Sequence, residues 1–145
     1  MQPFLIELKK EQASIKAKHN KYIPLVIKIS PDLAADSLQN TARIICDTKI
    51  DAVIATNTSL ARENLIDENK KETGGLSGKP LQKQSTQMIS ALHQQYPDLP
   101  LIAAGGIMDT TNAQEKWQAG ASLLQVYTGF IYNGPGLIKA LCEMA

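Results

Sequence analysis

The sequence predicts an α/β fold in which a leading helix is followed by four consecutive β-α units. Two observations support this prediction. Short apolar segments of strand length alternate along the chain with longer segments that carry apolar residues at helical spacing. Glycine, proline, asparagine and threonine gather in the turns between them. Alternation of this kind requires a parallel sheet whose strands are joined by right-handed crossovers.

The first half of the chain predicts two helices and two strands. A helix is expected over residues 3–22, because Pro3 suits a first helical turn. The apolar, β-branched segment 23–29 predicts a strand that is buried on both faces, as in a parallel sheet. A second helix is expected to end near Thr48, and the second strand covers residues 51–56.

A long polar connection over residues 59–79 separates these elements from the second half. Loops of this length are uncommon inside compact domains and tend to be functional. The elements expected after it are a helix over 81–96, a strand over 100–104, a helix from Asp109 or Thr110 to Gly120, a strand over 121–126 and a helix over 137–144.

Two architectures fit this alternation, a doubly wound sheet and a (β/α)₈ barrel. A doubly wound sheet binds its ligand at one switch point, whereas a barrel collects residues from every strand end. Here each strand is followed by residues suited to binding, and no Gly-x-Gly-x-x-Gly turn is present. We therefore expect half of a (β/α)₈ barrel of the TIM type, with residues 1–145 forming one partial domain.

The composition excludes several classes of function. The chain has 145 residues, of which 43% are hydrophobic and 20% charged, with a formal net charge of +1. These values are ordinary for a soluble globular domain with one core. No block of lysine and arginine indicates a nucleic-acid partner, and the apolar runs are too short for a membrane-spanning helix. The first residues lack the pattern of a signal peptide.

Metal binding and nucleophilic catalysis find no support in the residue spacing. His19, His93, Cys46 and Cys142 do not have the spacing of metal ligands, so no metal site is expected. Both cysteines are expected as buried thiols in a reducing compartment. No pair of carboxylates and no nucleophile next to a base stands out.

A phosphate site is expected in the segment 101–129. Gly105-Gly106 follows the third strand, and a turn at 127–129 follows the fourth. Two turns at neighbouring strand ends bring several backbone N–H groups to one point, which suits a phosphate. The last two strands are also where a β/α barrel usually binds one. The alternative is that glycine merely serves a strand-to-helix turn.

Three further features point to a ligand, each with a structural alternative. Lys28 stands in an apolar strand, where an ammonium is costly unless it meets a ligand, forms an ion pair with a core carboxylate or extends to solvent. The segment 56–58, Thr-Asn-Thr, suits a planar polar ligand or an ordinary turn. The glycines of segment 73–78 let backbone approach a cofactor closely, or make a flexible loop.

Together these strand-end motifs resemble the C-terminal half of dihydroorotate dehydrogenase. The resemblance rests on the segments 26–32 (VIKISPD), 53–58 (VIATNT), 73–81 (TGGLSGKPL), 104–107 (AGGI) and 120–130 (GASLLQVYTGF), which occur in the family's order. The continuation from Gly78 to Leu81, with Ser85-Thr86 beyond it, is similar to the quinone-dependent, membrane-associated class.

The resemblance implies an FMN-containing (β/α)₈ barrel that oxidises dihydroorotate to orotate in pyrimidine synthesis and passes electrons to a quinone. It implies FMN contacts at Lys28, Thr56, Gly78, Gly106, Tyr127 and Thr128, and dihydroorotate or orotate contacts at Asn57 and Thr58. It also implies a peripheral place on the cytoplasmic side of the inner membrane. The alternatives are another FMN- or sugar-phosphate-binding barrel enzyme, or a noncatalytic phosphate-binding half-barrel or defunct reading frame.

The family's catalytic base is a serine on a loop of the N-terminal half, which has no counterpart in this sequence. We therefore expect the chain to be inactive alone. An open four-stranded sheet also leaves two edges unpaired, which is a liability for solubility. We expect those edges to be covered by a complementary N-terminal half or by self-association.

Overall fold

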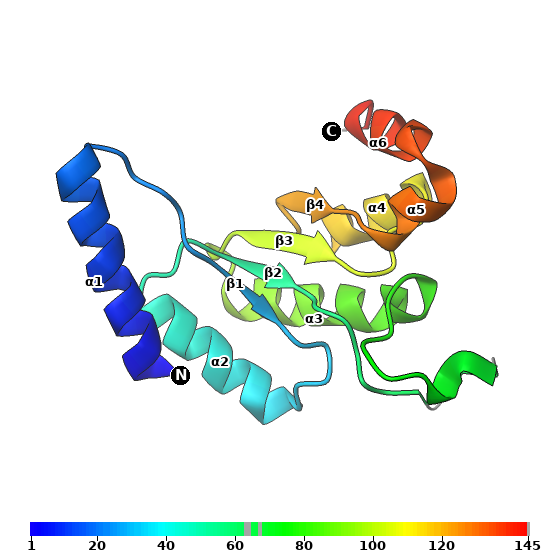
Figure 1. The fold of residues 1–145 in the computed structure, drawn as a ribbon, viewed down its shortest axis with the longest axis horizontal. Coiled ribbons are helices and arrows are strands. Elements are labelled where there is room, and N and C mark those ends of the chain that lie inside the picture. Colours follow the sequence, from blue (N-terminus) through cyan, green and yellow to red (C-terminus); the bar gives the residue numbers. More distant parts are fainter. Residues whose placement is uncertain (63–64, 67, 145) are drawn as a thin grey trace.

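A computed structural model describes residues 1–62, 65–66 and 68–144. Its centre is a parallel sheet of four strands in the order β1-β2-β3-β4 (Figure 1). The strands are β1 (Val26–Ile29), β2 (Ala52–Ala55), β3 (Leu101–Ala104) and β4 (Leu123–Gln125). The helices are α1 (Gln2–His19), α2 (Ala35–Asp47), α3 (Gln82–Gln95), α4 (Thr110–Gln118), α5 (Thr128–Asn133) and α6 (Pro135–Cys142), with short 3₁₀ helices η1 (Glu68–Lys71) and η2 (Lys79–Leu81).

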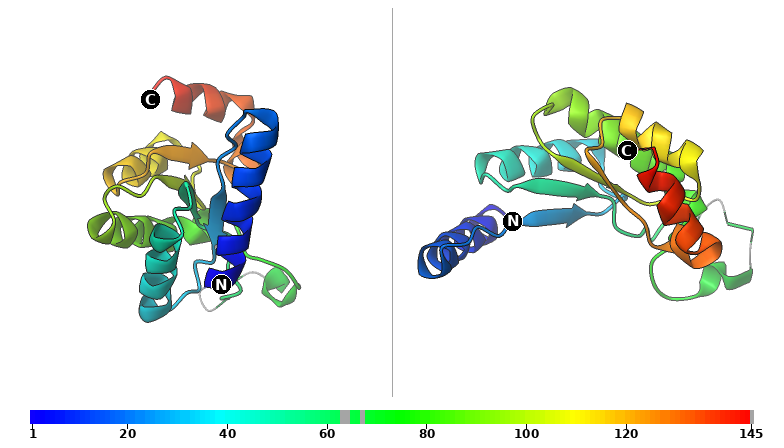
Figure 2. Two further views of the ribbon diagram at one scale, coloured as in Figure 1. Left: turned by 90° about the vertical axis from the view of Figure 1, so that its left-hand side faces the viewer. Right: turned by 90° about the horizontal axis from the view of Figure 1, so that it is seen from above.

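The arrangement of helices confirms the predicted fold class and decides between the two architectures. The strand order follows the chain order, and α2, α3 and α4 all lie on one face of the sheet (Figure 2). A doubly wound sheet would instead carry helices on both faces. Sequential parallel strands with helices on one side are the arrangement of part of a (β/α)₈ barrel.

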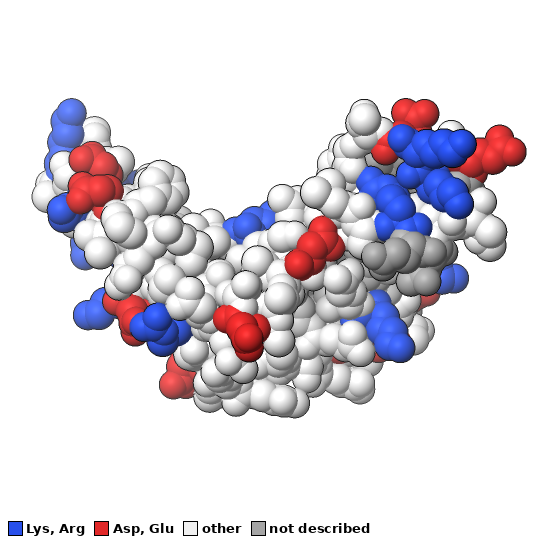
Figure 3. Space-filling view, turned by 90° about the horizontal axis from the view of Figure 1, so that it is seen from below, with Lys and Arg blue, Asp and Glu red and all other residues white. Residues whose placement is uncertain are grey.

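The two faces of the sheet differ sharply in burial. Ile29, Ala55 and Ala103 form one row of paired residues, and all three are buried under the helices. The neighbouring row begins with Lys28, which is exposed, and ends with Leu123, which is 61% exposed. We call this second face the open face. Figure 3 shows it as a hollow between α1 at one end and the segment around η1 at the other.

The expectation that the first strand is buried on both faces is wrong. Val26 and Lys28 are exposed, because no described element covers the open face above β1. The strand also begins at Val26 and not at residue 23. Pro24, two residues earlier, has no backbone N–H for a strand ladder.

Helix α1 is fixed beside the amino ends of the strands by the Asp51 carboxylate. Asp51 accepts hydrogen bonds from the Leu25 N–H at 2.7 Å, from the Gln12 side chain at 3.1 Å and from the Tyr22 hydroxyl. Burial acts to raise the pKa of Asp51, but these hydrogen bonds and Lys9 outweigh it and lower the pKa below its usual value. Gln12 also donates to the Ile23 carbonyl at 2.6 Å, so α1 contacts both β1 and β2 through their entering loops.

Two smaller expectations about the C-terminal part need correction. The sequence predicts a turn at residues 127–129, but α5 begins at Thr128, with two residues between it and the end of β4. The helix places successive backbone N–H groups at the strand end, as a turn would. Cys142 was expected to be buried and is exposed, while Cys46 is partly buried and burial raises the pKa of its thiol.

The one-sided core predicts a contrast between two leucines. Replacing Leu101, which is 0% exposed under the helices, by alanine should lower the free energy of unfolding by about 2–5 kcal/mol, because a buried cavity is left. The same change at Leu123, on the open face, should cost less than about 1 kcal/mol. Urea denaturation of both variants measures this contrast, and equal losses would contradict the assignment of the two faces.

Candidate functional site

A pocket of about 250 Å³ opens at the carboxyl ends of the strands. Every site residue expected from the sequence lines it: Lys28, Thr56, Asn57, Thr58, Gly78, Gly106, Tyr127 and Thr128. Parallel strands end at one edge of the sheet, so the residues that follow them converge there although they are far apart in the chain. The structure therefore brings the candidate residues together, while the ligand roles expected for them stay predictions.

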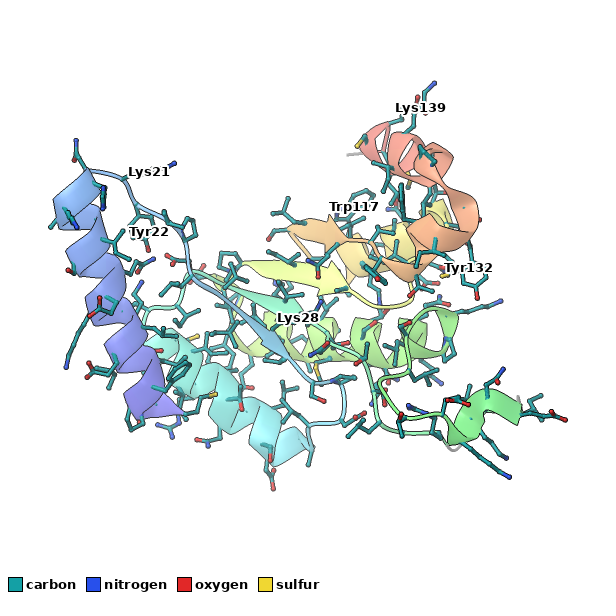
Figure 4. All side chains as sticks on the ribbon, viewed as in Figure 1. Lys21, Tyr22, Lys28, Trp117, Tyr132 and Lys139 are labelled. Atoms are coloured by element: carbon teal, nitrogen blue, oxygen red, sulfur yellow. The ribbon has the colours of Figure 1, made fainter. Side chains whose placement is uncertain are left out.

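Lys28 lies on the open face, which is turned toward the viewer in Figure 4. Its ammonium donates to the side-chain oxygen of Gln125 at 2.9 Å. Since Lys28 is on β1 and Gln125 on β4, this hydrogen bond crosses the whole sheet and requires the open face to be concave. Among the described residues Lys28 forms no ion pair with a core carboxylate, and its side chain is exposed because nothing described covers this face. The charge of Lys28 stays accessible to a ligand in the pocket.

Two glycines in the pocket wall occupy positions that exclude a side chain. Gly106 has φ +75°, and a Cβ there would lie 2.3 Å from the Cα of Gln82. Gly78 has φ +77°, and a Cβ there would lie 2.8 Å from the methyl carbon of Thr128. The backbone of both residues therefore forms the pocket surface directly. Next to Gly78, the Thr128 hydroxyl donates to the Ser77 hydroxyl at 2.9 Å, which joins the 59–79 connection to the start of α5.

The segment Thr56-Asn57-Thr58 is held by the neighbouring strands. The Thr56 N–H donates to the Ala104 carbonyl and the Asn57 N–H to the Ile29 carbonyl, both at 2.7 Å. Thr56 is only 2% exposed, whereas Asn57 and Thr58 are exposed at the pocket. The peptide bond before Thr56 is cis. The polar side chains at 57 and 58 are therefore available to a ligand on a fixed backbone.

The turn after β1 supports the connection that follows this segment. Asp32 accepts a hydrogen bond from the Ser59 hydroxyl at 2.6 Å and another from the Leu60 N–H at 2.8 Å. Arg62 then donates to the carbonyls of Ser59 and Gly74, and Ser59 pairs with Leu76 in an antiparallel bridge. These contacts close the base of the 59–79 connection beside the pocket.

Lys116 is the residue that sequence reasoning missed. It is 0% exposed on α4, and its ammonium donates to the Gln82 carbonyl at 2.9 Å, to the Thr86 hydroxyl at 2.7 Å and to the Ser85 hydroxyl. Burial lowers the pKa of Lys116 to about 8, against a smaller opposing effect of Glu115. The available signal was helical spacing, since Lys116 lies four residues after the buried Asn112 and three after Ala113.

A parallel sheet with helices on one face and a ligand pocket at the carboxyl ends of its strands defines a protein of the β/α-barrel class. Comparison with known sequences identifies the family within this class. The family model for dihydroorotate dehydrogenase matches residues 5–144. The chain belongs to the dihydroorotate dehydrogenase family.

Individual relatives agree with this assignment. The chain is 48% identical over 142 residues to dihydroorotate dehydrogenase (quinone) of Vibrio cholerae, and 48% identical over 141 residues to the protein of that name from Mannheimia succiniciproducens. Each alignment covers 96% of this chain and 42% of the relative. The crystal structure of Eimeria tenella DHODH in complex with ferulenol matches with a TM-score of 0.80 and 38% identity, covering 85% of this chain and 33% of that one. The chain thus spans less than half the length of these relatives.

No helix among the described residues is long and apolar enough to cross a bilayer.

The pKa of Lys116 predicts a pH-dependent stability. Its folded-state pKa of about 8 lies below the ordinary 10.5, so between these values the unfolded chain binds more protons than the folded one. The free energy of unfolding should therefore gain a rising contribution above about pH 8, and none below it where both states are protonated. Urea denaturation from pH 7 to 9.5 should show this rise in the wild type, relative to Lys116→Met. Identical pH slopes in the two proteins would contradict it.

Proposed function

We propose that this chain forms one wall of the active site of a quinone-dependent dihydroorotate dehydrogenase, an FMN enzyme that oxidises dihydroorotate to orotate. The observation that carries the proposal is that the pocket at the strand ends is lined by every residue that the family resemblance assigns to FMN or to orotate. Membership of the family supports it. The fold alone would not support this activity, since β/α barrels perform many reactions.

The residues in the pocket fit FMN. Gly106 and Gly78 line the pocket at positions where a Cβ would clash with Gln82 or Thr128, so backbone without a side chain faces the pocket there and a phosphate and a flat ring system could approach closely. Thr128 at the start of α5 would hold the phosphate with Gly106 and Tyr127, whose side chain is 77% exposed at the pocket. When bound, FMN would accept a hydride from the substrate and release electrons to the quinone.

The remaining residues would bind the ring and the substrate. Lys28 would contribute a positive charge that favours the anionic reduced flavin, with Thr56 beside it. Asn57 and Thr58, which are exposed at the pocket, would hydrogen-bond the orotate ring and its carboxylate. The serine that removes the substrate proton would come from the N-terminal half of the barrel, so catalysis would need both halves.

The open face suggests the partner. In this proposal the remaining β-α units of the barrel cover the concave face and pair with β1 and β4, whose outer edges are free among the described strands. The complete enzyme would lie peripherally on the cytoplasmic side of the inner membrane, where a quinone is available.

Flavin binding tests the cofactor assignment. Titration of the chain with FMN should perturb the flavin absorbance, and Lys28→Ala should weaken binding about tenfold to a hundredfold, because a charge-assisted contact is lost. Lys21→Ala, at an exposed lysine outside the pocket, is the matched control and should bind like the wild type.

The same titration separates the alternative functions. Binding of ribose 5-phosphate in place of FMN would indicate a sugar-phosphate enzyme. An unchanged affinity and flavin spectrum in Lys28→Ala would favour a noncatalytic or defunct half-barrel.

Exposure of the open face predicts self-association of the isolated chain. In sedimentation the average mass should rise with concentration, since Val26 and Leu123 leave apolar surface uncovered. Leu123→Lys should reduce the association, whereas Leu60→Lys, at a leucine 77% exposed in the 59–79 connection, should not. A monodisperse wild-type monomer across the concentration range would refute this prediction.

A further inference from the structure

Lys116 is the only charged side chain among the buried residues that the structure describes. All three donors of its ammonium are used, and all three acceptors are neutral oxygens in the first five residues of α3. No carboxylate lies within ion-pair distance of it in the described part of the chain. A buried cation without an anionic partner is costly, and a role in packing alone would be met more cheaply by methionine.

The acceptors connect Lys116 to the Gly105-Gly106 turn. The Ser85 hydroxyl, which accepts from the ammonium, lies 2.8 Å from the Gly105 carbonyl oxygen. Ser85 is 0% exposed and lies behind the turn, so a Cβ on Gly105 would meet it at 3.4 Å. The ammonium is thus one hydroxyl away from the backbone of the pocket wall.

The geometry of the Gly105-Gly106 peptide links the Ser85 contact on one side of the turn to the direction of an N–H group on the other side. The only cis peptide bond in the described residues is the one before Thr56, so the Gly105-Gly106 bond is trans. In a planar trans peptide the C=O and the following N–H point in opposite directions. A Gly105 carbonyl drawn back toward Ser85 therefore turns the Gly106 N–H the other way. Among the described residues this N–H has no hydrogen-bond partner.

The Lys116 ammonium and the amino end of α3 both place positive charge behind the turn, and the Glu115 carboxylate lies near them. Gly106 packs against Gln82, the first residue of α3, and the Gln82 carbonyl is itself an acceptor of Lys116. The amino end of a helix carries partial positive charge, which disfavours a nearby cation unless an anion balances both. Glu115, the acidic neighbour on α4, is hydrogen-bonded to the Gln82 amide at 2.7 Å.

We propose that Lys116 is a positioning residue for phosphate binding: it holds the Gly105-Gly106 peptide, through Ser85, with its N–H toward the pocket, and it supplies a buried positive charge behind that turn. The inference rests on the proposed function for the identity of the phosphate as that of FMN. Lys116 does not line the pocket. In this proposal it nevertheless determines how strongly the site prefers a flavin that carries a phosphate over one that does not.

The experiment compares FMN, riboflavin and inorganic phosphate as ligands of the full chain. Lys116→Met should weaken FMN and inorganic phosphate about tenfold or more, because a charge and an oriented donor are lost, while riboflavin affinity stays within about twofold. A general loss of structure would weaken both flavins alike. Lys139→Met, at an exposed lysine on α6, is the matched control and should bind all three ligands like the wild type.

A second pair of variants tests the connection through Ser85. Ser85→Ala and Thr86→Val each remove one acceptor of the same ammonium, but only Ser85 also contacts the turn. Ser85→Ala should therefore lose FMN affinity selectively over riboflavin, and Thr86→Val should lose little. This pair decides the matter if Lys116→Met does not fold.

The outcomes separate this inference from the proposed function. Phosphate binding without FMN binding in the wild type, abolished in Lys116→Met, would support the role of Lys116 and refute the FMN assignment. FMN binding that is equal in wild type, Lys116→Met and Ser85→Ala would refute the role of Lys116 alone. Binding of neither FMN nor phosphate by the wild type would refute both.

Discussion

The parallel register of the strands is the constraint on which the rest of the structure depends. Each strand pairs with the next along the chain, so all four carboxyl ends meet at one edge. That edge gathers a lysine from β1, the Thr-Asn-Thr segment after β2, the glycines after β3 and the start of α5 after β4. None of these features makes a binding site by itself. The parallel register places these features side by side, so that together they line one pocket. Backbone hydrogen bonds from Thr56 and Asn57 to neighbouring strands fix the position of the Thr-Asn-Thr segment in it.

Two lysines near the site differ in how their charge is placed: one is exposed and the other is buried. Lys28 keeps its charge on the concave open face and reaches Gln125 across the sheet. Lys116 buries its charge among neutral oxygens on the helical side, behind the glycine turn. The two ammonium groups thus approach the pocket from different sides of the same sheet. An anionic ligand between them would meet positive potential from both, which favours phosphate and a reduced flavin over neutral ligands.

Apart from the short helix α5, the sequence was sufficient for the order and type of the main elements and for the pocket residues, because strand-end motifs are local and parallel topology brings them together. It was misleading for Lys28, since apolar neighbours in a strand do not reveal whether both faces are covered. It gave only a weak signal for Lys116: its helical spacing after Asn112 and Ala113 places it on their face, but spacing does not distinguish a buried lysine from one at the margin of that face. The helix at Thr128 was read as a turn, since a six-residue helix leaves too short a period to detect.

Sequential strand order also has a kinetic meaning. Every strand after β1 finds its partner already synthesised, with no later strand to be inserted between them. The sheet can therefore lengthen by one β-α unit at a time as the chain leaves the ribosome, with only local loops to close. Growth in one direction leaves β4 as the edge completed last. Its readiness to accept a further strand then governs whether the nascent chain reaches a barrel or pairs with a neighbour.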